Sequence, residues 1–173
     1  MAPPLHLLLL LLLLLSAPRP STAQLPTATH LHFFLHEIFA VGDPGATSVS
    51  AAGGNDPSAF GFVGVYDDVL REGPEVDSAP IGRAQGFNAE ASSLAGHVAF
   101  LTIFSLVFTS GELNGSSLAI AGRSVVEGAA TSERSIVGGT GIFQSATGYV
   151  VSRPLTAPAT RLLLEFDAYI LHH

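Results

Sequence analysis

The chain of 173 residues contains no cysteine and no lysine. Without a thiol it can form no disulfide, no thiolate metal site and no copper site of the blue type, so these chemistries are excluded. The missing lysines leave a formal charge of −7, from 14 acidic residues against 7 arginines. An acidic surface without clustered positive charge is a poor match for nucleic acid or for an anionic membrane.

Long apolar runs are scarce as well, because only Leu7–Leu15 is continuously hydrophobic over more than a few residues. Its nine leucines have the length of the hydrophobic region of a secretory signal peptide and are too few to cross a bilayer comfortably. A signal anchor is the alternative, since no lysine or arginine precedes the run. The small residues Ser21, Thr22 and Ala23 follow the run, and we expect cleavage after Ala23. The prediction is a signal peptide over 1–23 and one secreted domain over 24–173, with Asn114 as its glycosylation acceptor.

The rest of the chain is typical of short strands rather than helices. Runs of Val, Ile, Phe and Thr alternate with Gly, Pro, Asn and Asp, and no convincing helical period appears. Eight or nine strands in one unit indicate an antiparallel barrel or sandwich, and an eight-stranded barrel leaves a lumen for one small ligand. The segment 98–108 is apolar on nearly both faces and should be buried on both sides. We expect strands at 30–40, 47–52, 60–68, 81–90, 98–108, 117–123, 132–137, 143–152 and 161–171.

The Gly-rich stretch 138–141, GGTG, is not a phosphate-binding loop, because no Lys followed by Ser or Thr comes after it. It lies between predicted strands, and we expect a hairpin turn with positive φ at its glycines. The sequence also has no GxSxG elbow and no cofactor motif, so it offers neither a hydrolase triad nor a predicted cofactor.

One face of the first predicted strand is apolar except for a single acid. Every second residue of LHFFLHEIF falls on this face. If the face lines the barrel interior, desolvation raises the pKa of the Glu37 carboxyl group, which can then act as an acid or base on a ligand. The alternatives are that the strand has left the core by Glu37, or that Glu37 pairs with Arg83. The residues of the face are Leu31, Phe33, Leu35, Glu37 and Phe39.

The other face of this strand carries His30, His32 and His36. Two histidines at i and i+2 of a strand can chelate a metal. However, His36 would lie about 13 Å from His32, so a further ligand such as His97 would be needed. The alternative is a polar face that points outward, and we predict no metal site.

Six stretches taken together resemble the plant dirigent proteins. They follow the order and spacing of that family and cover nearly all of the chain after the leader. They are FFLHEIF (33–39), FGFVGVYDDVLREGPE (60–75), IGRAQGF (81–87), FTSGELNGSSLAIAGR (108–123), IVGGTGIFQSATGYV (136–150) and LEFDAYILHH (164–173).

The resemblance implies an eight-stranded antiparallel up-and-down β-barrel, similar also to allene oxide cyclase, often trimeric and secreted to the plant apoplast. It implies no cofactor and no oxidation by the protein itself. A separate laccase or peroxidase makes phenoxy radicals from a monolignol such as coniferyl alcohol. The dirigent protein then fixes which faces couple and so gives one enantiomer of a lignan. Some relatives instead cyclise quinone methides, and others act as cell-wall scaffolds in lignin deposition.

The site residues that the resemblance implies depart from the pattern of lignan-forming members. Glu37 and Glu133 stand where Asp is usual, Asn88 where Tyr is frequent, and Gln144 where an Arg assists the second acid. We expect Glu37 and Glu133 to be the acid and base of one pocket, and pinoresinol formation to be weak or absent. The apolar residues expected to contact the substrate are Phe33, Leu35 and Phe39.

Overall fold

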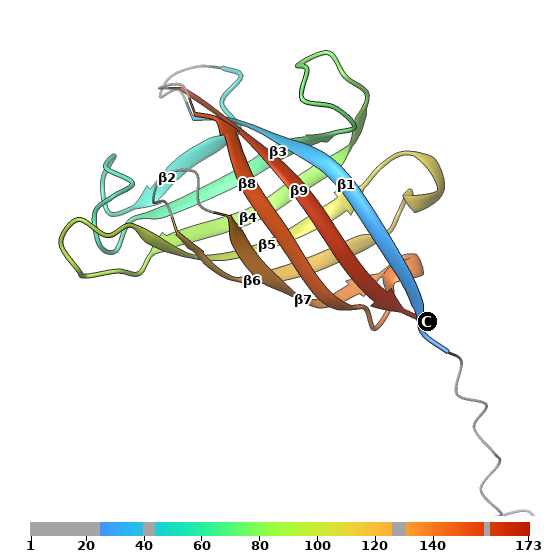
Figure 1. The fold of residues 1–173 in the computed structure, drawn as a ribbon. Helices are drawn as coiled ribbons and strands as arrows, with labels where there is room; N and C mark the ends of the chain where they lie inside the picture. Colours follow the sequence, from blue (N-terminus) through green and yellow to red (C-terminus); the bar gives the residue numbers. More distant parts are fainter. Residues whose placement is uncertain (1–24, 40–43, 126–130, 158–159) are drawn as a thin grey trace, which may run out of the picture.

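A computed structural model of the chain describes residues 25–39, 44–125, 131–157 and 160–173. The predicted signal peptide over 1–23 lies outside these residues. The described part forms nine strands and two short 3-10 helices, η1 (Gly111–Leu113) and η2 (Gly141–Phe143) (Figure 1). The strands are β1 (Thr27–Ile38), β2 (Ser48–Ala52), β3 (Val63–Arg71), β4 (Pro80–Glu90), β5 (Ala99–Phe108), β6 (Ser117–Val125), β7 (Ser132–Thr140), β8 (Thr147–Thr156) and β9 (Arg161–His172). No helix in the described part has the length and apolar character needed to cross a membrane.

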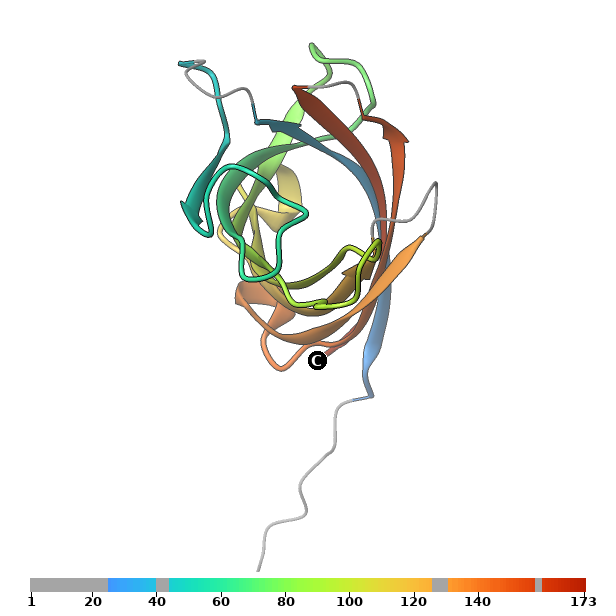
Figure 2. The same cartoon turned by 90° about the vertical axis from the view of Figure 1, so that its left-hand side faces the viewer.

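Eight of these strands close into an antiparallel barrel, which confirms the predicted fold. Their order around the ring is β1-β9-β8-β7-β6-β5-β4-β3, and β1 pairs back onto β3 (Figure 2). Strand β2 stands outside the ring, because it pairs with the first half of β3 whereas β1 pairs with the last residues of β3. Closure leaves the ring without an unpaired edge, which removes a template for aggregation.

Alternate side chains of each strand point into the barrel, and the largest of them fill one end. This end holds the β5–β6 and β7–β8 loops together with the start of β1 and the end of β9. Strand β4 contributes only small inward residues here, which leaves room for the aromatic side chains of β5. The other end of the barrel is therefore the one left hollow. The buried residues of the filled end include Phe33, Phe108, Leu118, Phe143 and Ile170.

Several details of the predicted strands are wrong, and one is the position of β3, which runs over Val63–Arg71 rather than 60–68. Strand β5 is buried on one face only, and Leu101 and Ile103 on its other face are more than two-fifths exposed. A barrel has a single interior, so a strand that is apolar on both faces still presents one of them outward. Strand β7 continues through the glycines to Thr140, and positive φ occurs only at Gly141. Strand β8 begins at Thr147 rather than 143, because η2 occupies the preceding residues.

Candidate functional site

A cavity of about 160 Å³ occupies the hollow end of the barrel. All eight strands of the ring contribute to its wall, at the ends of β1, β4, β6 and β8 and the beginnings of β3, β5, β7 and β9. The volume is below the roughly 300–1,000 Å³ of pockets for drug-sized molecules, which favours a small ligand. The apolar part of the wall is Leu35, Phe100, Phe104, Leu162, Leu164 and Phe166.

Two carboxyl groups face this cavity from neighbouring strands. The register of β1 on β3 pairs His36 with Val69, and one step further it sets Glu37 opposite Asp68. Asp68 is 1% exposed and accepts a hydrogen bond from the hydroxyl of Thr47. The two acids therefore share one site, although they are 31 positions apart in the chain.

Burial raises the pKa of both carboxyl groups. Desolvation is the main cause at Glu37, and a hydrogen bond from Ser48 opposes it. At Asp68, desolvation and the negative charge of Glu37 together raise the pKa to about 8. Asp68 therefore keeps its proton at neutral pH. A neutral carboxylic acid beside a carboxylate can give one proton and take another.

A buried arginine completes the polar part of the cavity. Arg134 is 6% exposed, and its guanidinium lies 5.2 Å from the ring centre of Phe104 and 5.3 Å from that of Phe166. Its Nη2 donates a hydrogen bond to the hydroxyl of Ser152, whereas its buried Nε has no partner. Burial lowers the pKa of Arg134 to about 10, so the group is still cationic at neutral pH.

Tyr66 and Asn88 line the same cavity from β3 and β4. Burial raises the pKa of the Tyr66 phenol, and the nearby charge of Arg134 opposes this shift. The phenol is therefore neutral at physiological pH and can donate or accept a hydrogen bond. The side-chain oxygen of Asn88 is buried and has no hydrogen-bond partner among the residues that the structure describes, which leaves an acceptor for a ligand.

The predicted site residues divide between the cavity and other places. Leu35, Glu37 and Asn88 line the cavity. Phe33 lies deeper, in the filled end, where its ring stacks 5.4 Å from that of Phe166. Phe39 follows the end of β1, is about a third exposed and does not line the cavity.

The expectation that Glu37 and Glu133 share one pocket is wrong. Glu133 is exposed on the outer face of β7, because its neighbours Ser132 and Arg134 take the inward positions. Gln144 is exposed at the end of η2, in the β7–β8 loop of the filled end. The structure places neither residue at the cavity.

The residues missed from the sequence include the three with titratable side chains, Tyr66, Asp68 and Arg134. Tyr66, Asp68 and the fully buried Leu70 are spaced two residues apart in β3, so they lie on the same face of the strand. This alternation could have predicted that Tyr66 and Asp68 point inward. Arg134 alternates in the same way with buried Ile136. The idea that Arg83 pairs with Glu37 is also wrong, because Arg83 binds Asp67 on the outside of the barrel.

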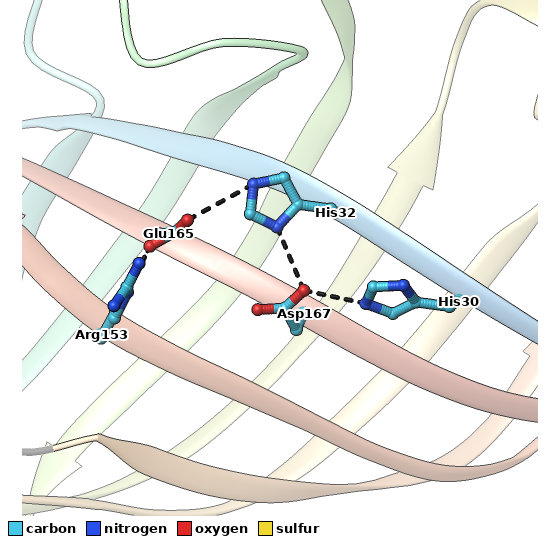
Figure 3. Close-up of polar contacts among 5 residues, drawn as sticks. All are labelled: His30, His32, Arg153, Glu165 and Asp167. Atoms are coloured by element: carbon cyan, nitrogen blue, oxygen red, sulfur yellow. Dashed lines mark hydrogen bonds and ion pairs between the residues drawn. The ribbon is translucent and has the colours of Figure 1, made fainter.

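The histidine face of β1 points outward, as its alternative interpretation held. Figure 3 shows that His30 and His32 of β1 both point toward Asp167 of β9. Their ring nitrogens lie 2.8 and 3.1 Å from the Oδ1 atom of Asp167. His32 also lies 3.4 Å from Glu165, which pairs with Arg153 of β8. The Asp167 carboxylate accepts a hydrogen bond from a ring nitrogen of each of these two histidines.

The remaining predicted ligands lie apart from this cluster. His36 donates a hydrogen bond to the carbonyl of Gly73. His97 lies in the β4–β5 loop. Among the residues that the structure describes, no group of three histidine or carboxylate side chains could hold a metal ion.

Comparisons with known proteins agree with the fold. The family model for dirigent-like proteins matches residues 28–171. Dirigent protein 21 of Arabidopsis thaliana is 39% identical over 150 residues, which cover 83% of this chain and 77% of that protein. Pterocarpan synthase 1 of Glycine max is 34% identical over 149 residues, which cover 84% of this chain and 79% of that protein.

A solved structure of a pterocarpan synthase dirigent protein is 31% identical to this chain and superimposes with a TM-score of 0.78. The match covers 91% of this chain and 97% of that protein. A second structure of this kind also has a TM-score of 0.78, at 33% identity, over 87% of this chain and 98% of the other. With a family model that spans the barrel and relatives above 30% identity along most of their length, the chain belongs to the dirigent family.

Proposed function

We propose that the chain binds a phenolic molecule in the barrel cavity and sets the stereochemistry with which that molecule couples or closes a ring. The observation that carries this proposal is the pair Glu37 and Asp68, two carboxyl groups on neighbouring strands facing one aromatic-walled cavity. Aromatic walls suit phenylpropanoid rings. The similarity to dirigent proteins and pterocarpan synthases supports a phenolic ligand.

The acid pair suits the chemistry of a quinone methide. The Asp68 carboxyl group donates its proton to the carbonyl oxygen of the quinone methide, and the Glu37 carboxylate accepts the proton of a hydroxyl group on the same molecule. A C–O bond forms between that hydroxyl oxygen and the methide carbon while the ring regains aromaticity. One proton enters and one leaves the ligand, so no oxidant takes part in this step.

The source of the intermediate separates two versions of the proposal. In the first, a partner laccase or peroxidase oxidises a monolignol such as coniferyl alcohol, and the cavity orients the resulting radicals for lignan formation. In the second, the chain itself cyclises a phenolic intermediate that arrives preformed. Relatives named pterocarpan synthase support the second version.

The first version is tested by coupling coniferyl alcohol with a laccase in the presence and absence of the mature protein. This version predicts an enantiomeric excess that rises with protein concentration and is lost in Asp68→Asn. Asp67→Asn is the matched control, because Asp67 points outward to Arg83. Product that is racemic at every protein concentration would overturn this version.

The second version is tested by adding a purified isoflavonoid quinone methide precursor without any oxidant. We expect the wild type to accelerate ring closure and Asp68→Asn to lose about 10²-fold or more of that rate, as for removal of a general acid. A rate equal to the uncatalysed one would overturn the cyclase version. If both assays are negative, the remaining hypothesis is a non-catalytic scaffold for lignin deposition in the cell wall.

We also propose that the mature protein is secreted, carries a glycan on Asn114 and assembles as a trimer, as the family resemblance implies. Asn114 is exposed at the end of η1, far from the cavity end of the barrel. Four exposed apolar residues that pair across β2 to β5 offer a surface for association: Val49, Val65, Phe87 and Ile103.

A further inference from the structure

Arg134 is a buried cation whose hydrogen-bonding capacity is almost unused. A guanidinium has five N–H donors, and among the described residues the one hydrogen bond of Arg134 joins Nη2 to the hydroxyl of Ser152. The Nε atom is buried and unpartnered. The charge itself is also uncompensated, because no ion pair joins Arg134 to a carboxylate in the described part of the chain.

A buried charge without a counter-ion is costly, and the sequence could have avoided it. The aromatic rings of Phe104 and Phe166 stabilise the guanidinium by cation–π contact, but they do not neutralise it. A residue such as Leu or Met would fill the same space without the desolvation cost. A buried, unpaired arginine on a cavity wall thus indicates an anion that arrives with the ligand.

The cavity has a positively charged side and an acidic side, and the two lie on opposite walls of the barrel. Arg134 belongs to β7, whereas Glu37 and Asp68 belong to β1 and β3. In the ring β7 is separated from β1 by β8 and β9, and from β3 by β6, β5 and β4. A single-ring ligand could therefore meet the acids with one end and the arginine with the other.

Resting on the proposed binding of a phenolic molecule, we propose that Arg134 binds a carboxylate of that molecule, so that the cavity selects phenolic acids over neutral phenolic alcohols. A hydroxycinnamate has the required form, with a phenol at one end of the ring and a carboxylate at the end of its side chain.

A carboxylate fits this arginine better than a phenol or an alcohol does. A carboxylic acid with a pKa near 4 is ionised in neutral water, whereas a phenol with a pKa near 10 is not. Two carboxylate oxygens can also accept two parallel N–H bonds from one guanidinium, which neither a phenol nor an alcohol can do. An alcohol would leave the charge of Arg134 unpaired.

The experiment compares three ligands that share one ring: 4-hydroxy-3-methoxycinnamate, its methyl ester and 4-hydroxy-3-methoxycinnamyl alcohol. Dissociation constants are measured by calorimetry on the mature chain. We expect the wild type to bind the carboxylate at least about 10-fold more tightly than the ester or the alcohol, a difference of about 1.4 kcal/mol. In Arg134→Met the ratio should fall to about one.

Arg153→Met is the matched control, because Arg153 is exposed on the outside of the barrel and should leave the ratio unchanged. Equal affinity of the wild type for carboxylate, ester and alcohol would overturn the role of Arg134 while leaving phenolic binding intact. Binding of none of the three would overturn phenolic binding itself. The ester comparison decides the question in the wild type even if Arg134→Met fails to fold.

Discussion

At the scale of the residue, the side chains of the cavity are set by where each stands in its strand. Glu37 and Asp68 face each other because β1 pairs with the last residues of β3. The neighbours of Asp68 one position away, Asp67 and Val69, belong to the outer face of β3. A carboxyl group on the inner face loses its water, and its neutral form is favoured.

The raised pKa of Asp68 predicts that stability falls as pH rises. The unfolded chain loses the Asp68 proton near pH 4, whereas the folded chain keeps it to about pH 8. Unfolding between these values releases a proton, so the free energy of unfolding drops by up to about 1.4 kcal/mol per pH unit. Below about pH 4 Asp68 is protonated in both the folded and the unfolded chain, so it does not lower the free energy of unfolding there.

Urea unfolding at several values between pH 5 and pH 8 measures this slope. Asp68→Asn should flatten it, while Asp67→Asn should keep it, because the side chain of Asp67 is half exposed. The same slope in Asp68→Asn and in the wild type would contradict a buried neutral acid at this position.

At the scale of the element, the division of the barrel into a filled and a hollow end follows from residue size along paired strands. The inward positions of β4 are Gly82, Ala84 and Gly86, and those of β5 opposite them are large and apolar. At the start of β5 the inward residue is Thr102, and the opposing residue of β4 is Asn88. The interior thus changes from packed hydrocarbon to a polar cavity within a few residues.

Gly86, like Gly82, is a position on β4 that cannot carry a side chain without cost. A Cβ added there would lie 2.3 Å from the carbonyl oxygen of Ile103 and 2.6 Å from the Cα of Phe104. Because both atoms are backbone, the strands would have to separate. We expect Gly86→Ala to lower the free energy of unfolding by about 1–3 kcal/mol, the usual range for overpacking.

Gly138→Ala provides the matched control within the same barrel. It also lies in a strand, but a Cβ there would meet no atom within 4 Å. Its free energy of unfolding should stay within about 0.5 kcal/mol of wild type. A loss at Gly138 equal to that at Gly86 in urea unfolding would show that the close approach of β4 and β5 is not the cause.

At the scale of the whole molecule, the outer face of the barrel is divided between polar and apolar surfaces. The histidines and carboxylates of β1 and β9 form a charged face (Figure 3). The exposed apolar residues of β2 to β5 form an apolar face. Single exposed apolar residues are ordinary on a protein surface, whereas a continuous row of them is not.

The proposed trimer predicts that a charge placed in this apolar row dissociates the assembly. Ile103→Glu should shift the mass measured by light scattering from three chains to one. Val137→Glu is the control, because Val137 is 62% exposed on β7, away from the row. A wild type with the mass of one chain would contradict the trimer.

Secretion is tested on protein collected from plant culture medium. We expect this protein to have been cleaved after Ala23 and to carry a glycan on Asn114.

The sequence by itself determined the barrel, the family and the placement of Glu37. These predictions rest on local properties: the alternation of apolar residues, the turn residues at regular intervals and the six family stretches. Such properties can be recognised without knowing which strands pair. The face of the first strand could be predicted because four of its five residues are apolar. Leu35 was placed on the inward face by alternation along the first strand, whereas Asn88 was assigned to the cavity on the resemblance alone.

Only the tertiary structure decided which polar side chains meet. Pairing of β1 with β3 brings Asp68 to Glu37, and a change of one residue in register or face would turn either acid outward. The same parity sends Glu133 to the surface and Arg134 into the cavity, a reversal that composition cannot reveal. Closure of the ring then buries an unpaired cation across from two acids, and this juxtaposition depends on all eight strands at once.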